Sequence, residues 1–283
     1  MISPQTSSVA VVGLGNLGAP VAHALVAAGW PVTVSDRNEQ RAVALADQLG
    51  ARAVSGSAVA ADIVVVVVTD DAAARSVILE PGGLLDRDAV GRGVVLHSTV
   101  LPETAQAIAT ACEGRGIAVL DAPVSGGSAR AREGDLTAMV GGTATALEEL
   151  RPVVESVAST LVHVGPPGAG AAAKLGNQVM MFSALAGVFE AIDLASAHGV
   201  KTDALLQVAQ SSTGASWVTE HWGFFPETAR AYDELGTPTA QRPWFKDLDE
   251  IAAAAETQGL TLPWTLALAG TIGERIEREA GQR

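Results

Sequence analysis

The 283-residue sequence predicts an α/β fold, with a doubly wound sheet first and an all-helical region after it. Short β-branched runs alternate with helical segments up to residue 165, as in parallel sheets with helical crossovers. Five consecutive valines at 64–68 indicate a strand covered on both faces. After Gly-Pro-Pro-Gly at 165–168 no further strand-like run follows, so we expect domains at 1–165 and 166–283.

The individual elements follow from hydrophobic periodicity. Strands are expected at 9–14, 32–35, 63–68, 94–97, 117–120, 136–140 and 161–164. Helices are expected at 17–28, 39–49 and 102–115, then at 171–197, 202–210, 246–257 and 263–279. Residues 212–241 hold several aromatic side chains without clear periodicity, and we expect short helices and a loop there, with the aromatic side chains packing at an interface or lining a substrate pocket.

Composition excludes several classes of function. Lys and Arg number 18 against 31 Asp and Glu, and the resulting net charge of −13 argues against nucleic acid or an anionic membrane as partner. The apolar stretch at 175–189 is shorter than a membrane span, and we expect a helix buried in protein. A single cysteine, Cys112, and a start without signal-peptide character favour the cytoplasm. No histidines have metal-ligand spacing, so no metal site is predicted.

A glycine-rich turn connects the first expected strand to the first expected helix. Gly13 permits the tight turn, Gly15 leaves room for a pyrophosphate, and Gly18 lets the helix pack closely on the strand. The second strand ends at Asp36, at the spacing of a dinucleotide-binding fingerprint. The predicted fold is therefore of Rossmann type. The candidate phosphate-binding residues are Gly13, Leu14, Gly15, Asn16, Leu17 and Gly18.

Asp36 favours NAD over NADP as the cofactor. Its carboxylate is suited to the adenosine ribose hydroxyls and repels a 2′-phosphate. Arg37 is suited to a 2′-phosphate, or is simply a solvated loop charge, and leaves NADP as the second choice. The glycine turn by itself also fits FAD or S-adenosylmethionine.

Lys174 stands at the expected start of a long apolar helix, where the helix dipole disfavours a cation. That field is expected to lower its pKa, and a lysine that loses its proton near neutral pH can act as a general base. Asn177 and Gln178 follow at spacings that place all three side chains on one helix face. The alternative is a lysine that lies along the core and extends its amine to solvent.

The segment 121–128, Asp-Ala-Pro-Val-Ser-Gly-Gly-Ser, follows an expected strand. Ser125, Gly126 and Gly127 can present a hydroxyl and consecutive backbone N–H groups to a carboxylate. The alternative is an ordinary turn. Asp121 is expected to fix its own loop, and His97 to be a strand-end histidine with a backbone partner.

Four segments in this order make the chain resemble the β-hydroxyacid dehydrogenases. They are 13–18, 121–127, 168–178 and Lys-Asp-Leu at 246–248, and they span nearly the whole chain. The resemblance implies hydride transfer between a nicotinamide and a β-hydroxy acid, with Lys174 as acid/base and a homodimer or higher oligomer. It further implies substrate contacts from Ser125, Gly126, Gly127, Asn177 and Gln178, where many relatives have Asn at the position of Gln178.

The resemblance also implies cofactor contacts from Thr69, Asp70 and Thr99, and places Lys246 near the nicotinamide. Two other functions remain open: an imine reductase, although that group usually replaces the lysine, and a non-catalytic nucleotide-binding module. Asp70 and Asp71 also suit the start of a helix, as N-cap and first-turn charge.

Overall fold

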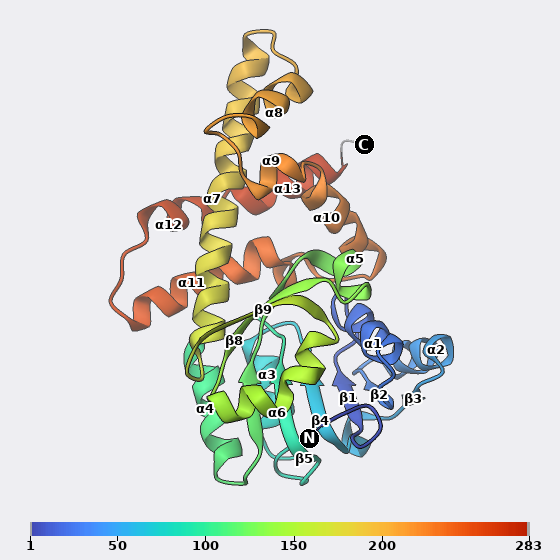
Figure 1. Ribbon diagram of the computed structural model, residues 1–283. Coiled ribbons are helices and arrows are strands. Elements are labelled where there is room, and N and C mark those ends of the chain that lie inside the picture. Colours follow the sequence, from blue (N-terminus) through green and yellow to red (C-terminus); the bar gives the residue numbers. More distant parts are fainter. Residues whose placement is uncertain (1, 282–283) are drawn as a thin grey trace. The chain divides into compact units, whose positions relative to one another are not determined.

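The computed structural model describes residues 2–281, and the chain divides into two compact units, Met1–Lys174 and Leu175–Arg283 (Figure 1). The first unit contains the sheet, and the second is helical in its described residues. The predicted fold class is confirmed. The division falls inside helix α7 (Ala169–Ala197), later than the predicted boundary at residue 165.

The sheet has the strand order β3-β2-β1-β4-β5-β6-β8-β7, with β9 paired to β8. The first six strands follow the order of a Rossmann sheet and are mutually parallel, so their carboxyl ends share one edge. The strands are β1 (Val9–Val12), β2 (Val32–Ser35), β3 (Arg52–Ala53), β4 (Ala61–Val66), β5 (Val90–Leu96), β6 (Ala118–Asp121), β7 (Val124–Ser125), β8 (Leu136–Gly141) and β9 (Ala158–Gly165).

Beyond β6 the sheet is mixed, whereas the strand and helix alternation predicted parallel pairing. β8 runs antiparallel to both β6 and β7 and parallel to β9. The reason is the short connection across residues 122–135, which contains only the two-residue strand β7 and the six-residue helix α5 (Gly127–Arg132). The two-residue strands β3 and β7 are too short to produce a periodic signal, and neither was predicted.

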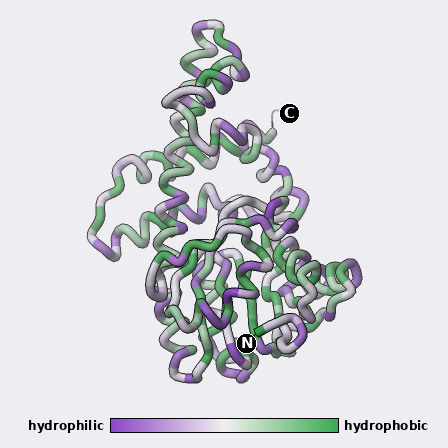
Figure 2. Tube along the Cα trace, in the orientation of Figure 1, coloured by the Kyte–Doolittle hydropathy of each residue, from purple (hydrophilic) through white to green (hydrophobic). Residues whose placement is uncertain are grey.

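Helices cover both faces of the sheet. The central valines show this directly, because Ile63 and Val65 lie in one hydrophobic cluster while Val64 and Val66 lie in the other. Figure 2 colours the chain by hydropathy, and hydrophobic (green) segments run through the first unit. One cluster includes side chains of α1 (Gly18–Ala27), α2 (Glu39–Leu49), α5 and α6 (Ala144–Glu155), and the other includes those of α3 (Asp71–Ile78) and α4 (Pro102–Glu113).

The second unit is a set of helices around its own hydrophobic cluster, in which Phe182, Trp244 and Ile276 are almost fully buried. The helix predicted at 263–279 is two helices, interrupted at Gly270 and Thr271. The helices that follow α7 are α8 (Thr202–Gln210), α9 (Trp217–Glu220), α10 (Phe224–Glu234), α11 (Pro243–Thr257), α12 (Pro263–Ala269) and α13 (Ile272–Gly281).

Helix α7 is apolar on every side, but only one stripe of it is buried. The stripe repeats at helical spacing and includes Lys174, Gln178 and Phe182, whereas Met180 is 68% exposed. Only 17% of its most apolar window is buried within the single chain, so the prediction of a helix buried in protein stays a prediction. By length and composition α7 could cross a membrane, which for one such helix is weak evidence.

Candidate active site

The glycine turn after β1 has the shape that a dinucleotide requires. Gly13 has a φ of +92°, and a side chain there would collide with the carbonyl of Val67. A side chain on Gly18 would collide with the Gly13 carbonyl, while nothing lies within 4 Å of the corresponding position on Gly15. The first and third glycines are therefore needed for the fold, and the second leaves open space for a phosphate. These residues fit an NAD(P) pyrophosphate at the start of α1.

Asp36 lies at the end of β2 and is tied to the glycine turn. Its Oδ2 accepts a hydrogen bond from the Leu14 N–H at 2.7 Å, and its Oδ1 accepts one from the Asn38 N–H at 2.8 Å. Arg37 is exposed, whereas Arg41 Nη1 lies 3.8 Å from Asp36 Oδ2. Arg41 was not predicted. The available signal was its position in the first turn of α2, because that turn begins close to the carboxyl end of β2.

The loops after β4 and β5 share the sheet edge with the glycine turn. Ser98 Oγ accepts a hydrogen bond from the Val68 N–H at 2.8 Å and so joins the two loops. Asp70 is the N-cap of α3 and accepts from the Ala73 N–H, with Asp71 in the first turn, as predicted. Thr69 Oγ1 donates to Asp70 Oδ2 at 2.9 Å, and Thr99 is half-buried. These residues lie at the edge where Rossmann proteins bind their cofactor.

The loop after β6 bends back through β7 to reach α5. Gly126 has a φ of +140° and Gly127 a φ of +80°, values that disfavour any side chain. Ser125, Gly126 and Gly127 are only partly buried, so the segment can be reached by a ligand. Consecutive N–H groups in such a turn attract anionic oxygens.

Lys174 is brought to this loop by α7. The side chain is 8% exposed, and its Nζ donates a hydrogen bond to the Val124 carbonyl at 2.9 Å, beside Ser125. Because α7 begins at Ala169, Lys174 lies in its second turn rather than at its start. The field at a helix end falls off within the first turn, so the helix dipole acts on the Lys174 amine less than its predicted position at the helix start implied. The location of the amine beside the substrate loop is the stronger observation.

In the second unit, Gln178 belongs to a buried polar network. Its Nε2 donates to Asp247 Oδ2 at 2.6 Å, and Lys246 Nζ donates to Asp247 Oδ1 at 2.7 Å. Glu250 also pairs with Lys246, and the two carboxylates raise the pKa of Lys246 even though burial opposes this. Asn177 Nδ2 lies 3.4 Å from Gln178 Oε1. Asp247, which is 2% exposed, was not predicted, although it stands beside Lys246 in the Lys-Asp-Leu segment.

His97 has the structural role that was predicted. Its Nδ1 lies 2.6 Å from the Ala122 carbonyl, and burial lowers its pKa to about 4. It is therefore neutral and donates through Nδ1 near neutral pH. Across the described residues, no group of three or more His, Cys, Asp or Glu side chains is arranged to hold a metal ion.

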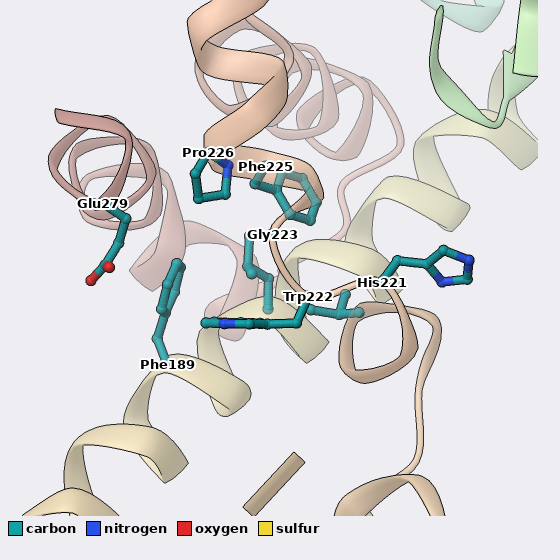
Figure 3. Close-up of a pocket in the computed structure, with 9 residues that line it drawn as sticks. Phe189, His221, Trp222, Gly223, Phe225, Pro226 and Glu279 are labelled. Atoms are coloured by element: carbon teal, nitrogen blue, oxygen red, sulfur yellow. The ribbon is translucent and has the colours of Figure 1, made fainter. Parts of the chain in front are cut away.

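The aromatic segment of the second unit packs mostly on itself and on α7. Trp222 meets Phe189 edge-on with ring centres 5.5 Å apart, and Phe225 lies 6.5 Å from Phe182. Figure 3 shows Trp222 and Phe225 lining a small pocket with Glu279. The pocket holds about 20 Å³, which is room for roughly one water molecule. It is too small for an organic substrate.

The fold, the glycine turn and the Lys174 loop together define a nicotinamide-dependent dehydrogenase. Residues 8–165 match a family described as the NAD-binding domain of 6-phosphogluconate dehydrogenase. Residues 168–283 match one described as the NAD-binding domain of NADP-dependent 3-hydroxyisobutyrate dehydrogenase. The chain belongs to the β-hydroxyacid dehydrogenase family and is an NAD(P)-dependent oxidoreductase of the hydride-transfer type.

Individual relatives agree with this membership. The NAD-dependent L-serine dehydrogenase of Pseudomonas aeruginosa is 35% identical over 260 residues, which cover 90% of this chain and 87% of that protein. A Mycobacterium tuberculosis 3-hydroxyisobutyrate dehydrogenase solved with L-serine is 30% identical with a TM-score of 0.80, covering 97% and 95% of the two chains. An imine reductase from Pseudomonas sp., at 22% identity and a TM-score of 0.64 over 97% and 94%, shares the fold alone.

Proposed function

We propose that this enzyme interconverts a small β-hydroxy acid and its semialdehyde or ketone, with Lys174 as the general acid/base. The observation that carries the proposal is the hydrogen bond from Lys174 Nζ to the Val124 carbonyl. It holds the amine beside Ser125 and the two glycines with positive φ, so a proton-transfer group and an anion-binding turn share one place. The named relatives support a carboxylate-bearing substrate.

Each group of the site has one task in this proposal. When bound, the nicotinamide supplies the hydride acceptor for alcohol oxidation. The backbone N–H groups of Gly126 and Gly127, with the Ser125 hydroxyl, hold the substrate carboxylate. Neutral Lys174 accepts the proton of the substrate hydroxyl as the carbonyl forms, and in reduction its ammonium form returns that proton. Gln178 and Asn177 orient the substrate or fix the lysine, and Lys246 contributes positive charge near the cofactor.

The test of this assignment is Lys174→Ala. We expect kcat to fall on the order of 10²-fold or more, the usual contribution of a positioned acid/base. Binding of the reduced cofactor, followed by its fluorescence, should persist because the glycine turn is untouched. Lys201→Ala, at an exposed lysine that precedes α8, serves as the matched control and should retain parental turnover. A folded Lys174→Ala enzyme with near-parental kcat would refute the proposal.

The substrate is best sought among hydroxy acids with a free carboxylate. L-Serine and 3-hydroxyisobutyrate come first, because relatives of the chain are named for them or solved with them. The resemblance to the family implies Asn at the position of Gln178 in many relatives, and Gln lengthens this side chain by one methylene, so the panel should extend to hydroxy acids of different size. Initial rates across a hydroxy-acid panel, with NAD and then NADP, identify the substrate. Silence across the panel with cofactor binding intact would favour the non-catalytic alternative.

We propose NAD as the preferred cofactor. Asp36 presents a carboxylate at the end of β2, where the adenosine ribose binds in this fold, and a 2′-phosphate would meet that charge. Arg41 lies within 3.8 Å of the same carboxylate and is the cation best placed to soften this selectivity. The relatives differ, since one is named NAD-dependent and one matching family NADP-dependent. The test is to measure the dissociation constants of NAD and NADP for the parent and for Asp36→Asn. The parent should bind NAD more tightly than NADP, and the variant should gain affinity for NADP.

We also propose a homo-oligomer, dimer or larger, in the cytoplasm. Large apolar side chains of the second unit are exposed in the single chain, among them Met180 at 68%, Leu194 at 66% and Trp264 at 82%. A second copy covering the open sides of α7 accounts for them better than a membrane, because α7 lies within the matched 168–283 domain. Light scattering after size exclusion should give at least twice the 28.7 kDa chain mass.

A further inference from the structure

The Asp121 carboxylate lies between the end of β6 and the first turn of α7, two segments that are 47 to 50 residues apart in sequence. Its Oδ1 accepts a hydrogen bond from the Gly168 N–H at 3.0 Å, and its Oδ2 accepts one from the Ala171 N–H at 2.9 Å. The first N–H groups of a helix have no partner within the helix. Asp121 therefore caps α7 from a distant strand.

The backbone closes tightly around this carboxylate, which is 2% exposed. A side chain on Gly141 would come within 2.5 Å of Asp121 Oδ1 and 2.6 Å of the Gly170 nitrogen. A side chain on Gly170 would collide with the Asp121 carbonyl. Glycines are therefore required on both sides, and the helix start has little freedom to move against β6 and β8.

The same short loop holds Lys174 at its other end. Val124 stands three residues after Asp121 and accepts the hydrogen bond from Lys174 Nζ. The loop and the first two turns of α7 are thus joined twice, once at the helix N-terminus and once at the amine. A shift of α7 by one residue moves a side chain by about 1.5 Å along the axis and roughly 100° around it, and that removes the amine from the loop.

We propose that Asp121 is a positioning residue for Lys174, which fixes the register of α7 so that the amine meets the loop that binds the substrate. This inference rests on the proposed role of Lys174. It assigns to Asp121 an effect on turnover that acts entirely through the lysine, in addition to any contribution to the fold.

A double-mutant cycle with Asp121→Asn and Lys174→Ala tests it. Asparagine keeps the shape but offers one oxygen and an N–H group to two backbone donors. We expect Asp121→Asn to lower kcat about 10-fold or more, because small misplacements of a catalytic group are costly. The dissociation constant of the reduced cofactor should stay within about two-fold, and Asp121→Asn should cause no further loss of kcat when Lys174 is already Ala.

Thr143→Ala is the matched control for the loss of a helix cap. Thr143 Oγ1 accepts from the Ala146 N–H at 3.1 Å and caps α6, which does not carry the lysine. This variant should lower the melting temperature while leaving kcat at the parental level.

Each other outcome is decisive. Additive losses in the cycle, or unchanged kcat in Asp121→Asn, overturn the positioning role while leaving Lys174 as acid/base. Full activity of Lys174→Ala refutes the proposed function itself. If Asp121→Asn does not fold, Gly141→Ala, which displaces the same carboxylate, takes its place in the cycle. If neither variant folds, Asp121 serves the fold alone and the proposal fails.

Discussion

The buried polar side chains of the candidate site in the first unit bind backbone groups, whereas the buried amide and charged side chains of the second unit bind mainly other side chains. Ser98, Asp121 and Lys174 each pair with a main-chain N–H or C=O. In the second unit Gln178 pairs with Asp247, and Arg242 pairs with Glu277 and Asp233. The difference follows from the architecture, since strand ends and loops offer free backbone groups while helix interiors offer few.

The two kinds of partnership respond differently to substitution. A backbone group cannot be removed, so losing its side-chain partner leaves it unsatisfied whatever else is changed. When the partner is another side chain, both residues of the pair can be replaced together, and the loss of folding stability is then smaller than for a single replacement. The second unit should therefore tolerate paired changes that the first does not.

Arg242→Met is expected to have the largest effect on stability. The Arg242 side chain is almost fully buried, with Nη1 2.6 Å from Glu277 Oε2. Breaking such a pair by removing one partner costs about 3 to 5 kcal/mol, and we expect about 3 because Glu277 is partly exposed and keeps its bond from Trp244 Nε1. Urea unfolding followed by tryptophan fluorescence measures it, since Trp30 is the sole tryptophan outside the second unit.

The comparison is sharpened by the double variant Arg242→Met with Glu277→Gln. It should recover part of the lost stability, because the Glu277 carboxylate is no longer left unpaired, while the carboxylate of Asp233, the other partner of Arg242, is 62% exposed and can be solvated by water. Arg130→Met, which breaks the exposed pair with Asp135 in the first unit, should change the free energy of unfolding by about 0 to 1 kcal/mol. No recovery in the double variant would mean that Arg242 acts by packing rather than by pairing.

The same contrast explains how much the sequence predicted. The strand runs, the glycine turn and helix α2 at 39–49 appear as expected, because each depends on local pattern and turn chemistry. Asp36 accepts a hydrogen bond from the Leu14 N–H of the glycine turn because parallel strand ends share an edge, and its predicted contact with the adenosine ribose hydroxyls stays a prediction. The proposed roles of these residues in binding and catalysis stay predictions.

Long-range pairing and chain reversal were not predictable in the same way. Asp247 and Gln178 are 69 residues apart, and no periodicity indicates that their side chains meet. The antiparallel turn of β8 depends on a short connection whose two-residue strand β7 has no pattern of its own. The two compact units divide inside α7, one or two turns after the Pro/Gly cluster where the helix starts, whereas the family matches end at residue 165 and begin again at residue 168.

His97 is a further side chain of the first unit with a backbone partner, and it makes the stability of the protein depend on pH. Burial lowers the pKa of His97 to about 4 from an ordinary 6.5, so the folded state resists its protonation. As pH falls from 6.5 towards 4, the unfolded chain binds the proton and the folded chain does not, and stability is lost over that window. The loss is about 3 kcal/mol for a shift of this size.

The measurement is the free energy of unfolding of His97→Gln and the parent between pH 7 and 4. The variant should start less stable, because the bond to the Ala122 carbonyl is altered, and should show a shallower decline with acid. His198→Gln, at an exposed histidine after α7, should keep the parental slope. Equal slopes for His97→Gln and the parent would assign the acid sensitivity to carboxylates instead.

Apart from the control substitutions, Ser98→Ala has the smallest expected effect, and it tests the difference between the two units most directly. Its hydroxyl accepts from the Val68 N–H at 2.8 Å, and its removal leaves a partly buried donor without that partner, at a cost of about 1 to 2 kcal/mol. Thr110→Ala, which removes an exposed hydroxyl bound to the Gln106 carbonyl, should cost less. Because the partner of Ser98 is main chain, no second substitution should restore the loss, in contrast to the Arg242 and Glu277 pair. A second-site change at Val68 that restored full stability would contradict the distinction between the units.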